Sequence, residues 1–402
     1  MSGLVAPPLS LYVHLPWCVS KCPYCDFNSH VHKGALPEAE YVAALLADLE
    51  ADLPLAAGRR VESVFLGGGT PSLFAPETLA RLLGGLRARL EFAPDAEITL
   101  EANPGTIEHG RFAGYAQAGI NRVSLGAQSF GARQLVALGR IHAADDTGRA
   151  VAELGAARLS NFNLVLMYAL PEQALAGAIA DVEAALALAP PHLSHYQLTL
   201  EPGTPFHARP PALPDEELAF EMQLATHAQL RSAGLAQYEV SAWARAGAEC
   251  RHNLNYWRFG DYLGLGAGAH GKLSDATAGT IRRTAKARQP RDYLARAARG
   301  APLGSVEPVP VEQRPFEFML NALRLTAGFG AADFEARTGL SLATVAATLE
   351  RLARRGLLAA ATDGAWWQPT ELGLRFLNEL QLAFLPAPRR SHEGEARVRL
   401  GS

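Results

Sequence analysis

The sequence predicts a mixed α/β fold, in which a partial (β/α)6 barrel precedes a smaller winged-helix-like α+β domain. Short strand patterns alternate with helical patterns six times before residue 234. Such alternation is typical of a parallel sheet that is covered by helices. Glycine-rich and polar segments follow the strands, as they do in barrels whose site lies at the carboxyl ends of the strands. A doubly wound sheet is the alternative, because alternation alone does not separate the two folds.

Each unit of the predicted barrel has a strand rich in apolar or β-branched residues and a helix that often begins at a proline. Pro37 and Pro76 stand in first turns, where proline favours a helix start. Polar residues interrupt most of the strands. The expected strands are 11–15, 61–66, 96–102, 122–128, 159–166 and 192–198. The expected helices are 36–53, 75–90, 106–118, 145–157, 172–188 and 215–233.

Composition sets limits on compartment and partners. The 402 residues carry a formal charge of −3, so no overall positive charge favours nucleic acid. The first residues lack the basic and apolar regions of a signal peptide, and no run of about 18 apolar residues predicts a membrane span. Four cysteines in a chain of this length do not suggest a disulfide scaffold. We therefore expect a cytoplasmic protein with reduced thiols.

Three of the four cysteines, Cys18, Cys22 and Cys25, fall within eight residues after the first strand. Close spacing of this kind lets several thiolates face one metal centre. Three ligands would leave one iron of a four-iron cluster open, and an open metal position can bind a substrate or cofactor. A zinc site completed by His14 or His30 is the simpler alternative, although no second pair of ligands lies nearby.

Unusual residues also gather where the other strands end. Gly67–Ser72 follows the second strand, Glu101 and Asn103 end the third, Gln128 ends the fourth, and Arg140 lies in the loop region beyond. Taken singly, these residues could be a tight turn, a solvated acid and a loop cap. Their joint placement at one edge of a parallel sheet predicts a ligand site, in which successive glycines let the backbone approach the ligand closely.

The Cys-x3-Cys-x2-Cys spacing, with Tyr24 before the last cysteine, resembles the signature of the radical SAM superfamily. With Gly67–Ser72 and Glu201-Pro-Gly-Thr, the chain over about residues 9 to 380 resembles the oxygen-independent coproporphyrinogen III oxidase family. The resemblance implies a radical SAM barrel with a [4Fe-4S] cluster on the three cysteines, whose open iron binds S-adenosylmethionine. The residues that it places around that cofactor, or around a second copy, are Tyr12, Tyr24, Gly68, Gly69, Thr70, Glu101, Gln128 and Arg140.

Two positions depart from the oxidases of that family. Phe27 stands where they have a fourth cysteine, which argues against coproporphyrinogen oxidase activity. Val165 stands where the family usually has aspartate, and a valine side chain cannot accept a hydrogen bond from a ribose hydroxyl.

A second motif, His252-Asn253-Leu-Asn-Tyr256-Trp257, resembles that of the haem chaperone branch, HemW. The resemblance implies that His252, Asn253, Tyr256 and Trp257 bind haem. A neutral imidazole is a common axial ligand of haem iron, and the two aromatic rings could stack on a porphyrin. The alternative is a partly buried histidine that caps a loop, with both rings in the core. Cys250 is a second candidate ligand, although Cys-x-His is not the pattern of covalent haem attachment.

The expected domains are a barrel over 1–285, with a haem-binding extension at about 235–275, and a winged-helix-like domain over 311–385. Residues 286–310 read as a connector and 386–402 as a flexible tail. A DNA-binding regulator is the alternative for the C-terminal domain, because Arg351, Arg354 and Arg355 lie on its third helix. A short basic cluster is more often a solvated face.

The predicted function is that of a haem chaperone that binds a [4Fe-4S] cluster, S-adenosylmethionine and haem, and passes haem to an acceptor protein. The alternative is oxygen-independent coproporphyrinogen III oxidase. We expect no nucleic-acid partner, and leave open a membrane-associated acceptor and a homodimer.

Overall fold

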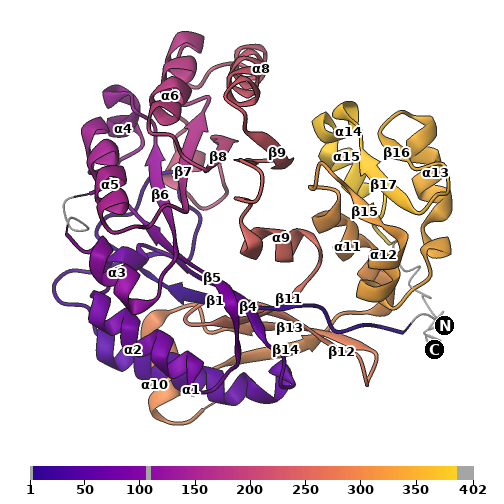
Figure 1. The fold of residues 1–402 in the computed structure, drawn as a ribbon, viewed down its shortest axis with the longest axis horizontal. Helices are drawn as coiled ribbons and strands as arrows, with labels where there is room; N and C mark the ends of the chain where they lie inside the picture. Colours follow the sequence, from indigo (N-terminus) through magenta and orange to yellow (C-terminus); the bar gives the residue numbers. More distant parts are fainter. Residues whose placement is uncertain (1–2, 106–109, 302, 387–402) are drawn as a thin grey trace, which may run out of the picture.

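The computed structural model describes residues 3–105, 110–301 and 303–386, and one large sheet dominates them (Figure 1). In the described residues this sheet has twelve strands, in the order β14-β13-β12-β11-β1-β4-β5-β6-β7-β8-β10-β9. Its central strands run parallel and follow one another in sequence order, as the predicted partial barrel requires. They are β1 (Leu9–Leu15), β4 (Val61–Gly68), β5 (Phe92–Ala102), β6 (Arg122–Gln128), β7 (Phe162–Tyr168) and β8 (His192–Gln197).

Helices cover the outer face of these strands (Figure 1). The predicted (β/α)6 barrel is thus confirmed, and the described residues add two short helices to it, α4 (Ala132–Ala137) and α7 (Pro205–Ala208). The expected helix over 106–118 begins at residue 112 in the structure, and residues 106–109 lie outside the described chain. The covering helices are α1 (Glu38–Ala56), α2 (Pro76–Arg87), α3 (Phe112–Ala118), α5 (Ala144–Ala156), α6 (Leu175–Ala187) and α8 (Glu216–Ser232).

Alternation along the strands separates the core from the barrel interior. In β6, Val123, Leu125 and Ala127 belong to the apolar core, whereas the intervening residues line a cavity inside the barrel. Successive side chains of a strand point to opposite faces of the sheet, so one face packs under the helices and the other faces inward. The polar residues that interrupt the predicted strands are therefore the ones that line the interior.

Additional strands extend the sheet beyond both ends of the barrel. β11 (Asp261–Leu265) runs parallel to β1, and three antiparallel strands follow it, β12 (His270–Asp275), β13 (Thr280–Lys286) and β14 (Gly304–Pro308). At the other end, β10 (Ala242–Ala244) pairs with β8 and with β9 (Ala236–Glu239).

The segment 286–310, which we expected to be a connector, forms α10 (Pro290–Ala298) and β14. All five residues of β14 are exposed. This strand is joined to the sheet by backbone pairing with β13 and has no apolar stripe that the sequence could reveal.

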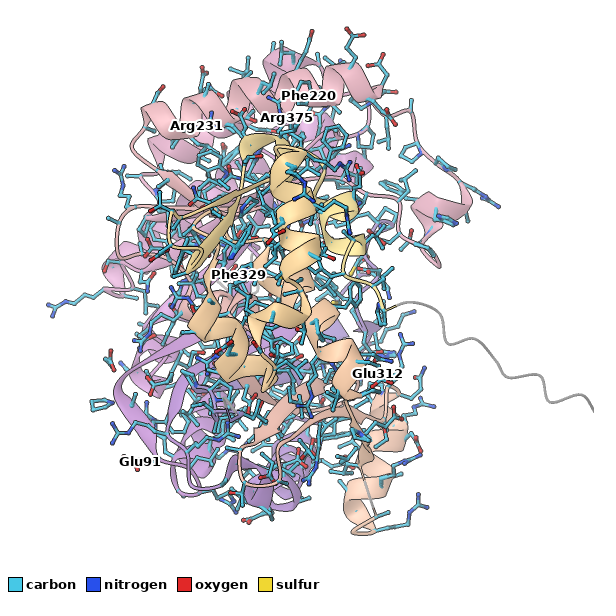
Figure 2. All side chains as sticks on the ribbon, turned by 90° about the vertical axis from the view of Figure 1, so that its right-hand side faces the viewer. Glu91, Phe220, Arg231, Glu312, Phe329 and Arg375 are labelled. Carbon is cyan, nitrogen blue, oxygen red and sulfur yellow. The ribbon has the colours of Figure 1, made fainter. Side chains whose placement is uncertain are left out.

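The C-terminal domain has the predicted winged-helix-like order, and its core around Phe318 and Phe334 also takes in Leu4, Phe259 and Ile281 from outside the domain. It packs beside the barrel, with Arg375 lying 5.2 Å above the ring of Phe220 on α8 (Figure 2). No helix of the described residues is long and apolar enough to cross a bilayer. The elements of the domain are α11 (Arg314–Ala322), β15 (Phe329–Gly330), α12 (Ala331–Thr338), α13 (Ala346–Arg354), β16 (Leu358–Ala360), β17 (Trp366–Pro369), α14 (Glu371–Arg375) and α15 (Leu377–Leu382).

The basic cluster of this domain is largely engaged in ion pairs. Arg354 lies 3.8 Å from Glu350, and Arg355 lies 2.5 Å from Glu379. Both pairs are solvent-exposed, as on a solvated helix face. The expected tail lies outside the described residues from residue 387 onward.

Candidate cofactor site

A cavity of about 810 Å³ lies inside the barrel and reaches the cysteine loop, which forms part of its lining. Residues from the cysteine loop, the barrel strands, the α9 segment and the C-terminal domain line it. Most of the residues that the sequence predicted for a metal or S-adenosylmethionine meet here. They are Cys18, Cys22, Tyr24, Cys25, Gly68, Gly69, Thr70, Glu101, Gln128 and Arg140.

The cysteine loop is held in place by short strands and a polar anchor. β2 (Trp17–Cys18) pairs with β3 (His30–Val31), which brings the two ends of the loop together. Inside the loop, the backbone N–H of Cys25 donates to the carbonyl of Cys22 (3.1 Å). Asn28 donates from its amide to the carbonyls of Ala267 and Arg288, both at 2.9 Å. The loop is thus fixed by the segment that carries the sheet extension, far away in sequence.

A chain of hydrogen bonds connects two of the thiols. Thr70 donates to the Cys18 sulfur (3.4 Å) and accepts from the Asn103 amide (3.3 Å). Arg140 donates to the Asn103 side-chain oxygen and, at 3.7 Å, to the Cys22 sulfur. Burial raises the pKa of the Cys18 thiol, and the hydrogen bond from Thr70 opposes that shift. A hydroxyl donor and a guanidinium beside the sulfurs would stabilise thiolates.

The glycine-rich segment lies against the cysteine loop as closely as a backbone can. A Cβ on Gly69 would stand 2.6 Å from the Trp17 carbonyl oxygen, and one on Gly68 would stand 2.6 Å from the His14 ring. Gly68 also has a φ of +117°, which side-chain-bearing residues rarely adopt. The segment after β4 therefore needs glycine, and backbone hydrogen bonds hold it against the stretch that leads into the cysteine loop (Gly69 N–H to the Leu15 carbonyl, 2.9 Å).

Glu101 is the acid at the centre of this edge. Its carboxylate accepts from the Gly68 N–H at 3.2 Å. Burial raises the pKa of Glu101 to about 7. Gln128 ends β6 with a φ of +67°, a strained conformation for a residue with a side chain, and accepts from the Tyr196 hydroxyl at 3.4 Å. Carboxylate and amide groups of this kind suit a cationic ligand with amino and hydroxyl groups.

Two further positions that the sequence linked to the cofactor are Tyr12, which does not line the cavity, and Val165, which does. Tyr12 is not among the lining residues: its hydroxyl bonds the His14 ring at 2.9 Å, and its ring stacks on Phe65, which does line the cavity. Val165 lines the cavity from β7, so the departure from the family pattern falls inside the site.

The donor set fits a four-iron cluster. The three cysteines are free thiols, and they meet at one cavity beside a glycine turn. No group of three or more His, Cys, Asp or Glu side chains in the described ranges is arranged around a single metal ion. The thiolates of a cluster each bind a different iron, so they need not be that close to one another.

The expected haem residues lie on α9 (Arg251–Trp257), which packs against β4 inside the barrel. Asn253 lines the cavity, whereas His252, Tyr256 and Trp257 do not. His252 is 1 % exposed. Its Nδ1 bonds the Ser63 hydroxyl at 3.0 Å, and its Nε2 has no hydrogen-bond partner in the described structure.

The surroundings of His252 keep its ring neutral. Burial, helped by the charge of Arg122, lowers the pKa of His252 to about 3. The ring stacks on Phe65 and meets the edge of Tyr256, with centroids 5.2 Å and 4.9 Å away. A neutral imidazole with an unpartnered Nε2 has the chemistry of an axial ligand, but the ring is enclosed in this conformation.

Several lining residues were not assigned to the site from the sequence, notably Arg122, Tyr196 and Arg324. Asn103, which the sequence placed at the same edge as Glu101, lines the cavity with it. Arg122 stands at the other end of its strand, and Arg324 comes from the C-terminal domain. No local pattern places those two arginines in the barrel.

Comparison with known proteins agrees with this geometry. Residues 12–182 match the model of the radical SAM superfamily, and residues 309–376 match that of the HemN C-terminal domain. The chain is 49% identical over 379 residues to the heme chaperone HemW of Escherichia coli K12, covering 94% of this chain and 98% of that one. It belongs to the HemW branch of the radical SAM superfamily.

Other relatives of this HemW-branch chain agree. The heme chaperone HemW of Haemophilus influenzae is also 49% identical, over 94% of this chain and 98% of its own. Among solved structures, coproporphyrinogen III oxidase (HemN) from Escherichia coli matches with a TM-score of 0.79 at 23% identity, covering 94% of this chain and 90% of that one. The latter match shows a shared fold. The resemblance that the sequence motifs suggested is confirmed.

Proposed function

We propose that this protein is a haem chaperone of the radical SAM type, which binds a [4Fe-4S] cluster, S-adenosylmethionine and haem and passes haem to an acceptor protein. The observation that carries the proposal is the identity of 49% over nearly the whole chain with proteins named heme chaperone HemW. Phe27, in the position of the oxidases' fourth cysteine, adds support because it argues against the related oxidase activity.

In this proposal, Cys18, Cys22 and Cys25 hold the cluster, and its fourth iron is left for the amino acid group of S-adenosylmethionine. When reduced, such a cluster can supply an electron to that cofactor. The chain itself positions the cofactor. Gly68 and Gly69 line the cavity, and the Glu101 carboxylate, which accepts from the Gly68 N–H, lines it beside them.

Around that core, Thr70 and Arg140 hold two of the cysteine sulfurs. Tyr24 and Gln128 line the same cavity and would complete the pocket for the cofactor. Tyr12 would not contact the cofactor itself. Its ring stacks on Phe65, which lines the cavity, and would hold that side chain in position.

For haem, the proposal assigns His252 as axial ligand, with Asn253, Tyr256 and Trp257 around the macrocycle. The unpartnered Nε2 and the depressed pKa of His252 support this assignment. Because the ring is 1 % exposed, a haem bound through Nε2 requires α9 to move away from β4. The assignment thus predicts a conformational change on haem binding.

The experiment is anaerobic reconstitution of the cluster, followed by haem titration of the parent protein and of His252→Ala. The proposal predicts saturable haem binding by the parent and an altered axial-ligand spectrum in the variant. Unchanged haem spectra in the variant would remove His252 from the site. Anaerobic consumption of coproporphyrinogen III under reducing conditions would favour the oxidase and contradict the chaperone function.

A further inference from the structure

The amino ends of the central strands hold a buried cation that the site described so far does not use. Arg122 is the first residue of β6, is 1 % exposed and lines the cavity. Its Nε and Nη2 have no hydrogen-bond partner in the described residues. Burying guanidinium N–H groups without an acceptor costs folding free energy, and a ligand that supplies the acceptors would remove this cost.

The nearest carboxylate does not satisfy Arg122, because it is engaged elsewhere. Glu97 lies 3.8 Å from the Arg122 Nε, beyond hydrogen-bond distance. Its oxygens accept from the backbone N–H groups of Arg251 and His252, both at 3.2 Å, and from the Cys250 thiol at 3.5 Å. Glu97 therefore stabilises the start of α9, and the guanidinium keeps unused donors.

A second arginine lines the cavity and also keeps an unused donor, although it has an acid partner of its own. Arg324 reaches the cavity from the C-terminal domain, and its Nε also has no partner in the described structure. Its Nη2 pairs with Glu239 at 3.1 Å, and its guanidinium lies 4.3 Å above the Trp257 ring. The amide of Asn253 lines the same cavity.

The acids of the cavity lie at its other end. Asp26 lines it from the cysteine loop, Glu101 from the carboxyl end of β5, and Glu201 from the segment after β8. Arg122 and Gln128 are the two ends of β6, so they stand about 20 Å apart at roughly 3.3 Å per residue. A cofactor held at the cysteines therefore leaves the end at Arg122 for a different group.

We propose that Arg122, with Arg324 and Asn253, forms a carboxylate-binding subsite that receives a propionate side chain of the porphyrin. This inference rests on the proposed haem function and names the part of the ligand that Arg122 contacts. A carboxylate supplies the two acceptors that a guanidinium fork binds in parallel. The same end of the cavity adjoins α9, so the macrocycle would face the helix that carries His252. The carboxylate of a second S-adenosylmethionine is the other source of this chemistry.

The test compares haemin with haemin dimethyl ester, in which both propionates are esterified, on the cluster-loaded protein. The parent should bind the ester about 10- to 100-fold more weakly, because a charge-assisted bidentate contact is lost. Arg122→Gln should weaken binding of the free acid by a similar factor and leave binding of the ester unchanged. Arg122→Lys should fall between the two. Arg60→Gln, an exposed arginine paired with Glu91 outside the cavity, serves as control and should match the parent.

The outcomes separate this inference from the function on which it rests. Equal affinity of the parent for haemin and its ester overturns the subsite while leaving haem binding in place. Equal weakening of both ligands by Arg122→Gln also overturns it, since the variant then acts through the fold. If Arg122→Gln lowers the affinity or stoichiometry of S-adenosylmethionine and not of haemin, the carboxylate belongs to that cofactor and the porphyrin assignment fails. Absence of any haem binding by the parent removes the proposed function itself.

Discussion

Glu101 gives the sharpest quantitative prediction for the cofactor site. Burial raises the pKa of its carboxyl group to about 7, so the ionised fraction should rise from about one tenth at pH 6 to about nine tenths at pH 8. The apparent affinity for a cationic ligand that needs the carboxylate is proportional to the fraction of Glu101 that is ionised. The affinity for S-adenosylmethionine should therefore increase about tenfold over this range.

The assay is equilibrium binding of S-adenosylmethionine to anaerobic, cluster-loaded protein at pH 6, 7 and 8, with Glu101→Gln measured in parallel. The amino group of the ligand titrates too, so the slope of the variant is the reference from which the contribution of Glu101 is obtained. The variant should lack the tenfold change. Parallel pH profiles for the parent and Glu101→Gln would refute the reasoning.

The stability of the ligand-free protein checks the same pKa independently. A folded-state pKa above the ordinary value means that the folded protein binds this proton more tightly than the unfolded chain does. The stability that the proton confers is therefore present at low pH and lost as pH rises from about 4.5 to about 7. Urea unfolding of Glu101→Gln should show no such loss, and a loss equal to that of the parent would contradict the assigned pKa.

Two further substitutions test the scaffold by urea unfolding. Gly69→Ala places a Cβ against the backbone of the cysteine loop and should lower the free energy of unfolding by about 1–3 kcal/mol. Its control is Gly84→Ala in α2, where the added Cβ meets open space and stability should stay the same or rise by up to about 1 kcal/mol. Similar losses of stability in both variants would contradict the close approach. Lys286→Ala leaves Asp48 and Asp52 buried without their cation and should cost about 3–5 kcal/mol, and a loss below about 1 kcal/mol would show that these acids are neutral in the folded protein.

Much of the fold could be predicted from the sequence because the barrel repeats a strong local signal. Strand β6 was expected over 122–128 and is found there, since its alternating apolar residues face the helices. The strand β14 could not be predicted, because it is an exposed edge strand whose stability comes from backbone pairing with β13. Composition therefore suggested a connector where the chain extends the sheet.

Some residues of the site could likewise be predicted from the sequence, and others could not. Glu101 and Gln128 stand at the carboxyl ends of β5 and β6, so the parallel topology alone places them with the cysteines at one edge of the barrel. Arg122 occupies the opposite end of β6, and Arg324 arrives from another domain, so their meeting depends on tertiary packing. His252 shows the limit of a motif: its residue type fits an axial ligand, whereas its enclosure inside the barrel is a property of the fold.

The most direct test of the account is the iron and sulfide content of protein purified without oxygen, compared among serine variants of the cysteines. The account predicts about four irons and four sulfides per chain in the parent, and loss of both in Cys18→Ser, Cys22→Ser and Cys25→Ser. Cys250→Ser, in which the altered thiol lies at the start of α9, should keep the parent content. A parent without iron and sulfide, or variants of the three loop cysteines that retain both, would contradict the central claim.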